Sequence, residues 1–486
     1  MKKIFFFLLL LSNQIFSQEL YQEKYRPQFH FSPAKNWMND PNGLVYFNGE
    51  YHLFYQSNPL GNQWGHMSWS HSVSKDLLHW QQLPVALKEE NGIMMFSGSA
   101  VVDEKNTVGF GKNAMIAIYT GHTDTLQTQN IAYSNDAGRT FTKYANNPML
   151  NLHKKDFRDP NVFWYDKNDC WIMCVSHPNE HQIEFYQSKN LKDWKSLSRF
   201  GPVGDTSGVW ECPDLMQVSV EGTQQKKWVL FTSQNSTMQY FVGEFDGKNF
   251  INENPASKIF KQDYGTDYYA AVAYHNTPDK NPISIGWLNN WNYANDIPTT
   301  PWKSVMSLPR KLSLKKINGE WILIQTVLQN VKSLRSSAKS FSNKIVSKQI
   351  PISFKGNVFE AEIFFQPSAR GESGIKLSVG NGHYLKISYD AVSQQMIIDR
   401  SQTNTLFSKT FASIDQKSAP VQLQNGKLKW HIFFDKSIVE VFVNDGEVVF
   451  TTQIFSDENE NAVQLFSTKG IAKVEYLNFW NIKSIW

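Results

Sequence analysis

Short apolar runs separated by turn-forming residues dominate the chain. The runs at 51–55 (YHLFY), 114–119 (AMIAIY) and 227–231 (KWVLF) are aromatic or β-branched and have Gly, Asn, Asp or Pro nearby. Such runs are typical of β-strands, and convincing helical periodicity is nearly absent. The pattern therefore predicts an all-β protein.

A unit of strand, turn and strand recurs in the first two thirds of the chain. The strong copies open on an acidic residue and a proline, at Asp40, Asp159 and Glu211, and weaker copies open at Ser97 and Asp267. The copies begin roughly 50–60 residues apart, and a polar hairpin closed by an aromatic residue follows late in the first four. Each unit is interpreted as four strands. Five such units predict a five-bladed β-propeller over residues 25–325.

The last third of the chain has a different pattern. From about residue 340 the strands alternate strictly between apolar and polar positions, as in the runs at 359–365 and 439–443. Asn444-Asp-Gly446 is a strong hairpin signal between two of these runs. The pattern predicts a two-sheet β-sandwich over residues 340–486, after a short helix or linker within 322–334.

The first residues are typical of a secretory signal peptide. Lys2 and Lys3 precede an apolar run at 4–11, and a polar stretch ends at Ser17, which predicts cleavage of residues 1–17. The apolar run is too short to span a bilayer, and no later run is long enough. The mature protein is expected to be soluble and exported, to the periplasm or the medium. The net charge of +4 gives no electrostatic case for nucleic acid or an anionic membrane as partner.

Cysteines and histidines indicate neither a disulfide framework nor a metal site. Cys170 and Cys174 fall four residues apart in one predicted strand, about 13 Å at strand rise, which is too far to bridge. These two and Cys212 are expected to be buried thiols. The spacing of three neighbouring histidines matches no common zinc pattern, so they are interpreted as structural; they are His66, His71 and His79. No metal or cofactor is expected.

A propeller would bring distant carboxylates together. The residues that open its inner strands converge at one end of the central channel, which would gather Asp40, Asp159 and Glu211. Aromatic residues make up 14% of the chain, and aromatic faces are common in sugar sites. Each acid alone is compatible with an ordinary turn or surface residue. Their joint convergence favours glycoside hydrolysis, which needs a proton donor and a second carboxylate at the anomeric centre.

The residue types around the acids suggest their roles. Asp40, held by a Pro-Asn-Gly turn, is the candidate nucleophile. Glu211, with Trp210 and Cys212 as apolar neighbours, is the candidate acid/base. Asp159, beside Arg158, is expected to stay ionised and to accept hydrogen bonds from sugar hydroxyls. A Ser-His-Asp hydrolase is not supported, because the chain has no G-x-S-x-G motif.

A series of motifs resembles glycoside hydrolase family 32, the invertases, inulinases and levanases. The motifs occur in that family's order and cover nearly the whole mature chain. They are WMNDPNG (37–43), FYQSNP (54–59), WGHMSW (64–69), FSGS (96–99), RDP (158–160), ECPD (211–214), DYGTDYYAA (263–271), GWLNNWNYA (286–294), PWKSVMSLPRKL (301–312) and VEVFVNDGEVVFT (439–451).

The resemblance implies a five-bladed propeller followed by a β-sandwich, and a retaining double displacement on β-fructofuranosides. It implies that Asp40 is the nucleophile, Glu211 the acid/base and Asp159 the transition-state stabiliser. It also implies a set of fructosyl-pocket walls, namely Asn39, Gln56, Trp64, Phe96, Ser97, Arg158, Asp267 and Trp291. The sandwich would be a structural companion.

The functional hypothesis is a secreted exo-acting β-fructosidase that releases terminal fructose from levan, inulin or sucrose. The family often has an aromatic residue where this chain has Ser57, so the resemblance does not predict the details of the pocket rim. Retention of Asn39 favours hydrolysis over transfer. An endo-fructanase and a fructosyltransferase are the alternatives within enzymes. A non-catalytic fructan-binding protein is the alternative from another class. The choice between β-2,6 and β-2,1 linkages and the oligomeric state stay open.

Overall fold

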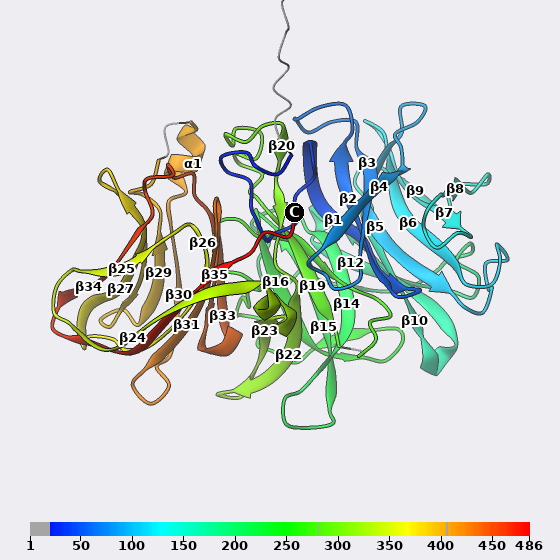
Figure 1. Cartoon of the computed structure of the whole chain (residues 1–486). Helices are drawn as coiled ribbons and strands as arrows, with labels where there is room; N and C mark the ends of the chain where they lie inside the picture. Colours follow the sequence, from blue (N-terminus) through cyan, green and yellow to red (C-terminus); the bar gives the residue numbers. More distant parts are fainter. Residues whose placement is uncertain (1–19, 280, 405–406) are drawn as a thin grey trace, which may run out of the picture.

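The computed structural model of the protein is built almost entirely of β-strands (Figure 1). It describes residues 20–279, 281–404 and 407–486, so the predicted signal peptide over residues 1–17 lies outside the described residues. The predicted all-β class is confirmed. No helix among the described residues is long and apolar enough to cross a membrane.

The N-terminal region, residues 36–327, folds into five sheets. The first sheet holds β20 (Trp302–Lys303), β1 (Asn36–Phe47), β2 (Glu50–Asn58), β3 (Ser68–Ser74) and β4 (Trp80–Leu87). The second holds β5 (Met94–Asp103), β6 (Ala114–His122), β7 (Gln127–Ser134), β8 (Thr142–Lys143) and β9 (Leu150–Lys154). The short return strand β20 pairs in parallel with β1, so the end of the region joins its beginning.

Of the other three sheets, two have four strands and the last has five. The third holds β10 (Arg158–Tyr165), β11 (Cys170–His177), β12 (Gln182–Ser188) and β13 (Lys195–Phe200). The fourth holds β14 (Glu211–Ser219), β15 (Lys226–Gln234), β16 (Thr237–Phe245) and β17 (Phe250–Asn252). The fifth holds β18 (Tyr269–Ala273), β19 (Ile283–Leu288), β21 (Val305–Met306), β22 (Arg310–Ile317) and β23 (Glu320–Val327). Two short 3₁₀ turns, η1 (Asp166–Asn168) and η2 (Pro178–Glu180), join strands of the third sheet.

The first strands of the five sheets contact one another in a closed cycle. β1 contacts β5, β5 contacts β10, β10 contacts β14, β14 contacts β18, and β18 contacts β1. Residues that open these strands therefore lie near one another although the chain separates them widely.

The C-terminal region is a sandwich of two six-stranded sheets. One sheet has the order β24 (Arg335–Val346), β35 (Ala472–Ile482), β26 (Val358–Gln366), β31 (Leu428–Asp435), β32 (Ile438–Val443) and β33 (Val448–Gln453). The other has the order β25 (Ile350–Lys355), β34 (Ala462–Lys469), β27 (Arg370–Gly380), β28 (His383–Asp390), β29 (Gln395–Asp399) and β30 (Gln416–Pro420). Apolar side chains of both sheets, such as Phe359 and Ile375, share one buried cluster.

Three short helical elements complete the C-terminal half: η3 (Gln329–Leu334), α1 (Lys409–Ser413) and η4 (Asn444–Gly446). The predicted hairpin at 444–446 is confirmed, because η4 joins β32 and β33, which pair antiparallel. Within 322–334, where a short helix or linker was predicted, the structure has η3. The residues before it continue β23 to Val327, because Trp321, Leu323 and Ile324 bury apolar side chains in the sheet.

Buried charges join the N-terminal region to the sandwich, which lie side by side in Figure 1 (blue to green, and yellow to red). Arg310 Nη2 lies 2.5 Å from Glu440 Oε2, and both side chains are buried. His30 lies between Asp435 and Glu440. Burial disfavours its cation, yet these two carboxylates raise the pKa of His30 to about 9.

Candidate active site

One cavity of about 300 Å³ gathers ten of the eleven predicted site residues. Met67 is the eleventh lining residue, and the sequence motifs did not single it out. The lining residues are Asn39, Asp40, Gln56, Trp64, Met67, Phe96, Ser97, Arg158, Asp159, Glu211 and Trp291. The three predicted acids therefore share one cavity, formed by segments of four different sheets.

Irregular pairing at the start of the inner strands places the acids. The register shifts between Met38 and Pro41 in β1, between Arg158 and Asn161 in β10, and between Glu211 and Asp214 in β14. At such a bulge a residue is left out of the ladder, and proline is tolerated because no donor is needed. Asp40 and Asp159 are left out of the ladder and are thus free to point away from the sheet, whereas Glu211 pairs with Ser233 and the bulge follows it.

The segment around Asp40 is a bulged strand rather than the predicted turn before a strand. β1 already begins at Asn36 and continues through Gly43. Gly43 has φ +52°, and a Cβ there would lie 2.8 Å from the ring of Phe54. Only glycine fits this kink, which the sequence pattern had suggested to be a turn.

Asp40 is a nearly buried carboxylate with two side-chain donors. Ser97 Oγ donates to Asp40 Oδ2 at 2.7 Å, and Asn39 Nδ2 donates to Oδ1 at 3.1 Å. Trp37 in turn donates its indole N–H to Asn39 Oδ1 at 2.7 Å, which fixes the amide. Burial raises the pKa of Asp40, although the Ser97 hydrogen bond opposes this effect and the nearby Glu211 charge adds to it.

Asp159 takes a left-handed backbone conformation, with φ 64°. Its Oδ2 accepts the backbone N–H of Cys212 at 2.9 Å. Burial raises the pKa of Asp159 to about 7, and this effect exceeds the lowering by Arg158. Burial thus opposes Arg158, which was expected to keep this acid ionised. Arg158 gives its hydrogen bonds to other acids.

Glu211 is held by polar groups. Arg158 donates to Glu211 Oε1 from Nε at 3.0 Å and from Nη2 at 2.8 Å. Tyr269 OH donates to Glu211 Oε2 at 2.5 Å. Trp210, which was expected to supply apolar surroundings, is fully buried in an apolar cluster and donates its indole N–H to the carbonyl of Asp205. Glu211 thus has both carboxylate oxygens bound by charged or hydroxyl donors.

Cys212 connects the two buried aspartates. Its Sγ lies 3.6 Å from Asp40 Oδ2 and 3.7 Å from Asp159 Oδ2. Burial, with the neighbouring carboxylates, raises the pKa of this thiol well above its usual value. The thiol is therefore a neutral weak donor. All three cysteines are free and buried, as predicted.

Aromatic side chains form the open side of the cavity. Trp64 is 42% exposed and Trp291 is 38% exposed, which is unusual for large apolar residues. Phe96 stacks on His122 with ring centroids 4.0 Å apart, and Trp291 packs against Trp37. These rings offer the kind of surface that packs against the C–H face of a sugar.

Asp267 does not line the cavity, and the expectation that it is a pocket wall was wrong. Its side chain is fully buried and pairs with Arg400 of the sandwich at 3.0 Å. It also accepts the Tyr293 hydroxyl at 2.7 Å. The motif placed Asp267 near the site in sequence, but the carboxylate points toward the second domain.

Besides Met67, two residues that contact the acids were not predicted from the sequence. Tyr269 stands in the DYGTDYYAA motif, yet one tyrosine among three in that motif gives no local signal of a contact with Glu211. Cys212 was noticed only as an apolar neighbour. Both contacts depend on strands that are distant in sequence.

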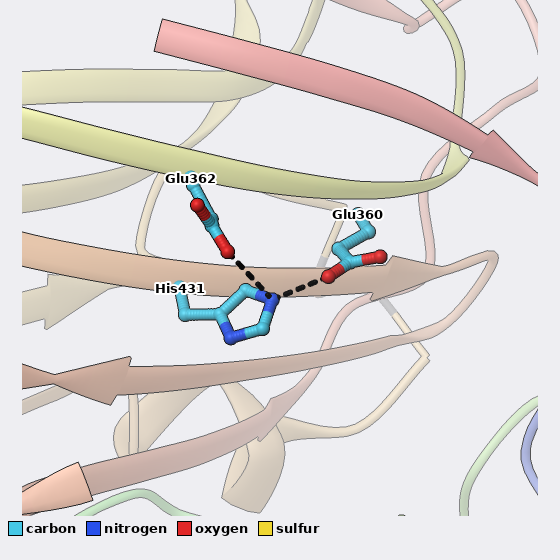
Figure 2. A group of neighbouring side chains, drawn as sticks. All are labelled: Glu360, Glu362 and His431. Carbon is cyan, nitrogen blue, oxygen red and sulfur yellow. Dashed lines mark hydrogen bonds and ion pairs between the residues drawn. The ribbon is translucent and has the colours of Figure 1, made fainter. Parts of the chain in front are cut away.

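One group of metal-ligand side chains occurs among the described residues, and it lies in the sandwich (Figure 2). His431 Nε2 lies 2.5 Å from Glu360 Oε1 and 4.0 Å from Glu362 Oε1. Arg335 donates to both oxygens of Glu360 at 2.6 Å, so a side-chain cation already neutralises this carboxylate. Arg335 and His431 therefore bind Glu360 as part of the sandwich structure.

The three neighbouring histidines have separate partners. His66 pairs with Glu89, and His79 pairs with Asp76. His71 contacts the buried ring of His52 at 3.0 Å. Their surroundings agree with the structural interpretation.

Comparison with known proteins gives consistent matches over both regions. Residues 30–326 match the N-terminal domain model of the glycosyl hydrolases family 32, and residues 330–481 match the C-terminal model of that family. The chain is 45% identical to a levanase from Bacillus subtilis (strain 168), over 96% of this chain and 72% of the levanase. It is 38% identical to the extracellular exo-inulinase of Aspergillus ficuum, over 96% of each chain. The crystal structure of exo-inulinase from Aspergillus awamori superposes with a TM-score of 0.91 at 37% identity, covering 96% of this chain and 100% of that one.

Proposed function

The chain belongs to glycosyl hydrolase family 32, and from this premise we propose that it is a secreted exo-β-fructosidase. Its substrates would be the terminal β-D-fructofuranosyl residues of levan, inulin or sucrose. The observation that carries the proposal is the meeting of Asp40, Asp159 and Glu211, each with different hydrogen-bond partners, in one aromatic-walled cavity.

The three acids have environments that suit a retaining double displacement. Asp40, buried and oriented by Ser97 and Asn39, attacks the anomeric carbon of the fructosyl unit. Glu211, the most accessible of the three, donates its proton to the leaving oxygen and then takes one from water. Arg158 and Tyr269 hold its carboxyl group in place between the two steps.

Asp159 serves binding rather than proton transfer in this scheme. Its carboxyl is fixed by the Cys212 backbone N–H and faces the cavity beside Asp40. Hydrogen bonds to fructosyl hydroxyls would hold the ring while positive charge develops at the anomeric carbon. Because the site is buried, each such hydrogen bond is stronger than it would be in water.

The exo mode is favoured by the size of the cavity. About 300 Å³ lies at the low end for small-ligand sites and accommodates a terminal sugar better than an internal stretch of polymer. The names of the relatives, levanase and extracellular exo-inulinase, agree with this choice. They also support export, together with the leader-like sequence at 1–17.

For the fold, the proposal is a five-bladed propeller over 25–325 and a sandwich domain over 340–486. The five sheets and the closed cycle of first-strand contacts support the propeller. The strand β24, which begins at Arg335, supports a domain change close to the proposed boundary.

The test is a product analysis on levan, inulin and sucrose side by side, with purified protein. Free fructose from the chain end is expected, and the Asp40→Ala and Glu211→Ala variants should lose several orders of magnitude in turnover. The matched control Asp445→Ala, which removes an exposed carboxylate of the sandwich, should keep wild-type turnover. Near-normal turnover in Asp40→Ala would overturn the mechanism.

Other outcomes identify the alternative functions. Short oligomers would indicate an endo-fructanase, and longer chains a fructosyltransferase. Fructan binding without any product on prolonged incubation would indicate a binding protein.

A further inference from the structure

We propose that Arg400, in the sandwich, is a positioning residue for the active site in the N-terminal region. It anchors two segments there, one that carries Tyr269 and one that carries Trp291. This inference rests on the proposed function and adds a role for the second domain in it.

Arg400, Asp267 and Tyr293 form a closed triangle of buried hydrogen bonds. Arg400 Nη1 lies 3.0 Å from Asp267 Oδ2, and Arg400 Nη2 lies 3.0 Å from Tyr293 OH. Tyr293 OH donates to Asp267 Oδ1 at 2.7 Å. The three side chains are fully or almost fully buried, so water does not compete for these bonds.

Gln453 of β33 reinforces the same contact from the sandwich side. Its backbone N–H donates to Asp267 Oδ2 at 2.9 Å, and its side-chain Nε2 lies 3.0 Å from Asp267 Oδ1. The same Nε2 lies 3.1 Å from Asn289 Oδ1, at the start of the Trp291 segment. One sandwich residue therefore contacts both segments.

The helix α1 covers the other side of the triangle. The guanidinium of Arg400 lies 3.7 Å from the centre of the Phe411 ring, and Tyr293 meets that ring edge-on at 5.0 Å. Ser408, which caps α1, donates to Asp296 Oδ2 at 3.0 Å. The Trp291 segment is thus held to the sandwich at Asn289, Tyr293 and Asp296.

Both anchored segments reach the cavity within two residues. Asp267 precedes Tyr269, whose hydroxyl donates to Glu211. Tyr293 follows Trp291, which lines the cavity. Two residues of extended chain span about 7 Å at most, so displacement of either anchor moves the adjacent residue, which is Tyr269 in one segment and Trp291 in the other. A further bond, from Asn290 Nδ2 to the carbonyl of Thr266 at 2.7 Å, ties the two segments together.

The opposing explanation is that the triangle only stabilises the domain interface. A buried carboxylate deprived of its cation destabilises a protein whatever its distance from a site. The test must therefore separate positioning from stability, and Tyr293→Phe is suited to this. It removes one hydroxyl from the triangle and keeps the ring that packs on Phe411.

For Tyr293→Phe we expect kcat/KM on sucrose and on levan to fall about tenfold, with a melting temperature near that of the wild type. KM should rise more than kcat falls, because Trp291 is loosened. Arg400→Lys, which keeps the charge but loses one donor group, should recover part of the activity lost in Arg400→Met. The matched control is Tyr389→Phe, whose hydroxyl bonds the carbonyl of Val421 inside the sandwich.

A double-mutant cycle with Trp291→Ala provides the decisive measurement. If the triangle acts through Trp291, adding Tyr293→Phe to Trp291→Ala should reduce kcat/KM by less than about twofold. Strict additivity, or wild-type kcat and KM in a folded Tyr293→Phe, would overturn the inference. A wild type without activity on any fructoside would instead overturn the proposed function, so the two failures are distinguishable.

Discussion

Tyr269 OH lies 2.5 Å from Glu211 Oε2 and is its hydrogen-bond donor from a neighbouring sheet. Tyr269 begins β18 and Glu211 begins β14, two strands in contact with each other. Arg158, at the start of β10, binds the other oxygen of the same carboxylate. The proposed acid/base is therefore held between the entrances of its two neighbouring sheets, which fixes the direction from which it can deliver a proton.

Tyr269→Phe should lower kcat/KM about 10- to 100-fold, because a hydrogen bond to a charged group is lost. The hydroxyl orients the Glu211 carboxyl toward the leaving oxygen, so its removal should lower kcat more than it raises KM. The matched control is Tyr274→Phe, since the Tyr274 hydroxyl is buried without a hydrogen-bond partner among the residues described. Wild-type kcat in a folded Tyr269→Phe would contradict the proposed role of Tyr269.

Ser97→Ala should move the acid limb of the pH profile of kcat/KM to higher pH. The Ser97 hydrogen bond opposes the burial that raises the pKa of Asp40, so its loss raises this pKa further. Because a nucleophile must be ionised, activity should fall more at pH 5 than at pH 7. The control is Ser378→Ala, which removes a buried hydroxyl of the sandwich. Equal losses at both pH values would argue against a direct effect on Asp40.

The thiol of Cys212 should resist alkylation in the folded protein. It is buried, and burial together with the adjacent aspartates raises its pKa well above the usual value. Thiolates, not thiols, are the reactive species. Incubation with iodoacetamide at pH 8 should leave activity intact, and peptide mass spectrometry should find label at position 212 only after unfolding in urea. Inactivation with label at Cys212 in the native protein would be the contrary result.

Asp214 should make stability depend on pH. Burial raises the pKa of Asp214 to about 7, and its Oδ1 has no hydrogen-bond partner among the described residues. The folded pKa exceeds the unfolded value of about 4. The stabilising contribution of Asp214 to the free energy of unfolding is therefore fully present below pH 4 and is lost as pH rises through 7.

The free energy of unfolding of Asp214→Asn, relative to that of the wild type, should therefore be higher at pH 8 than at pH 5, by about 3 kcal/mol at most. Urea unfolding at the two pH values measures the difference. Asp445→Asn, at an exposed site, serves as the control and should show the same stability difference at both. If the stability difference between Asp214→Asn and the wild type were equal at pH 5 and pH 8, Asp214 would not titrate as expected.

Local sequence determined the strands and much of the cavity lining. Apolar alternation, turn residues and the acid-proline repeat indicated five strand units and the hairpin at 444–446, and the family motifs indicated ten residues that share one cavity. These features depend on residues a few positions apart. Side-chain alternation and bulge chemistry are local properties, so a single sequence carries them.

Only the tertiary structure decided which distant groups meet and how deeply they are buried. Asp267 shares a motif with Tyr269, yet it points to Arg400 while Tyr269 points to Glu211. Arg158 is next to Asp159 in sequence, yet it hydrogen-bonds to Glu211, and burial raises the pKa of Asp159 against the charge of Arg158. The physical reason is that desolvation and hydrogen bonding depend on the packing of whole sheets, which short-range sequence patterns do not encode.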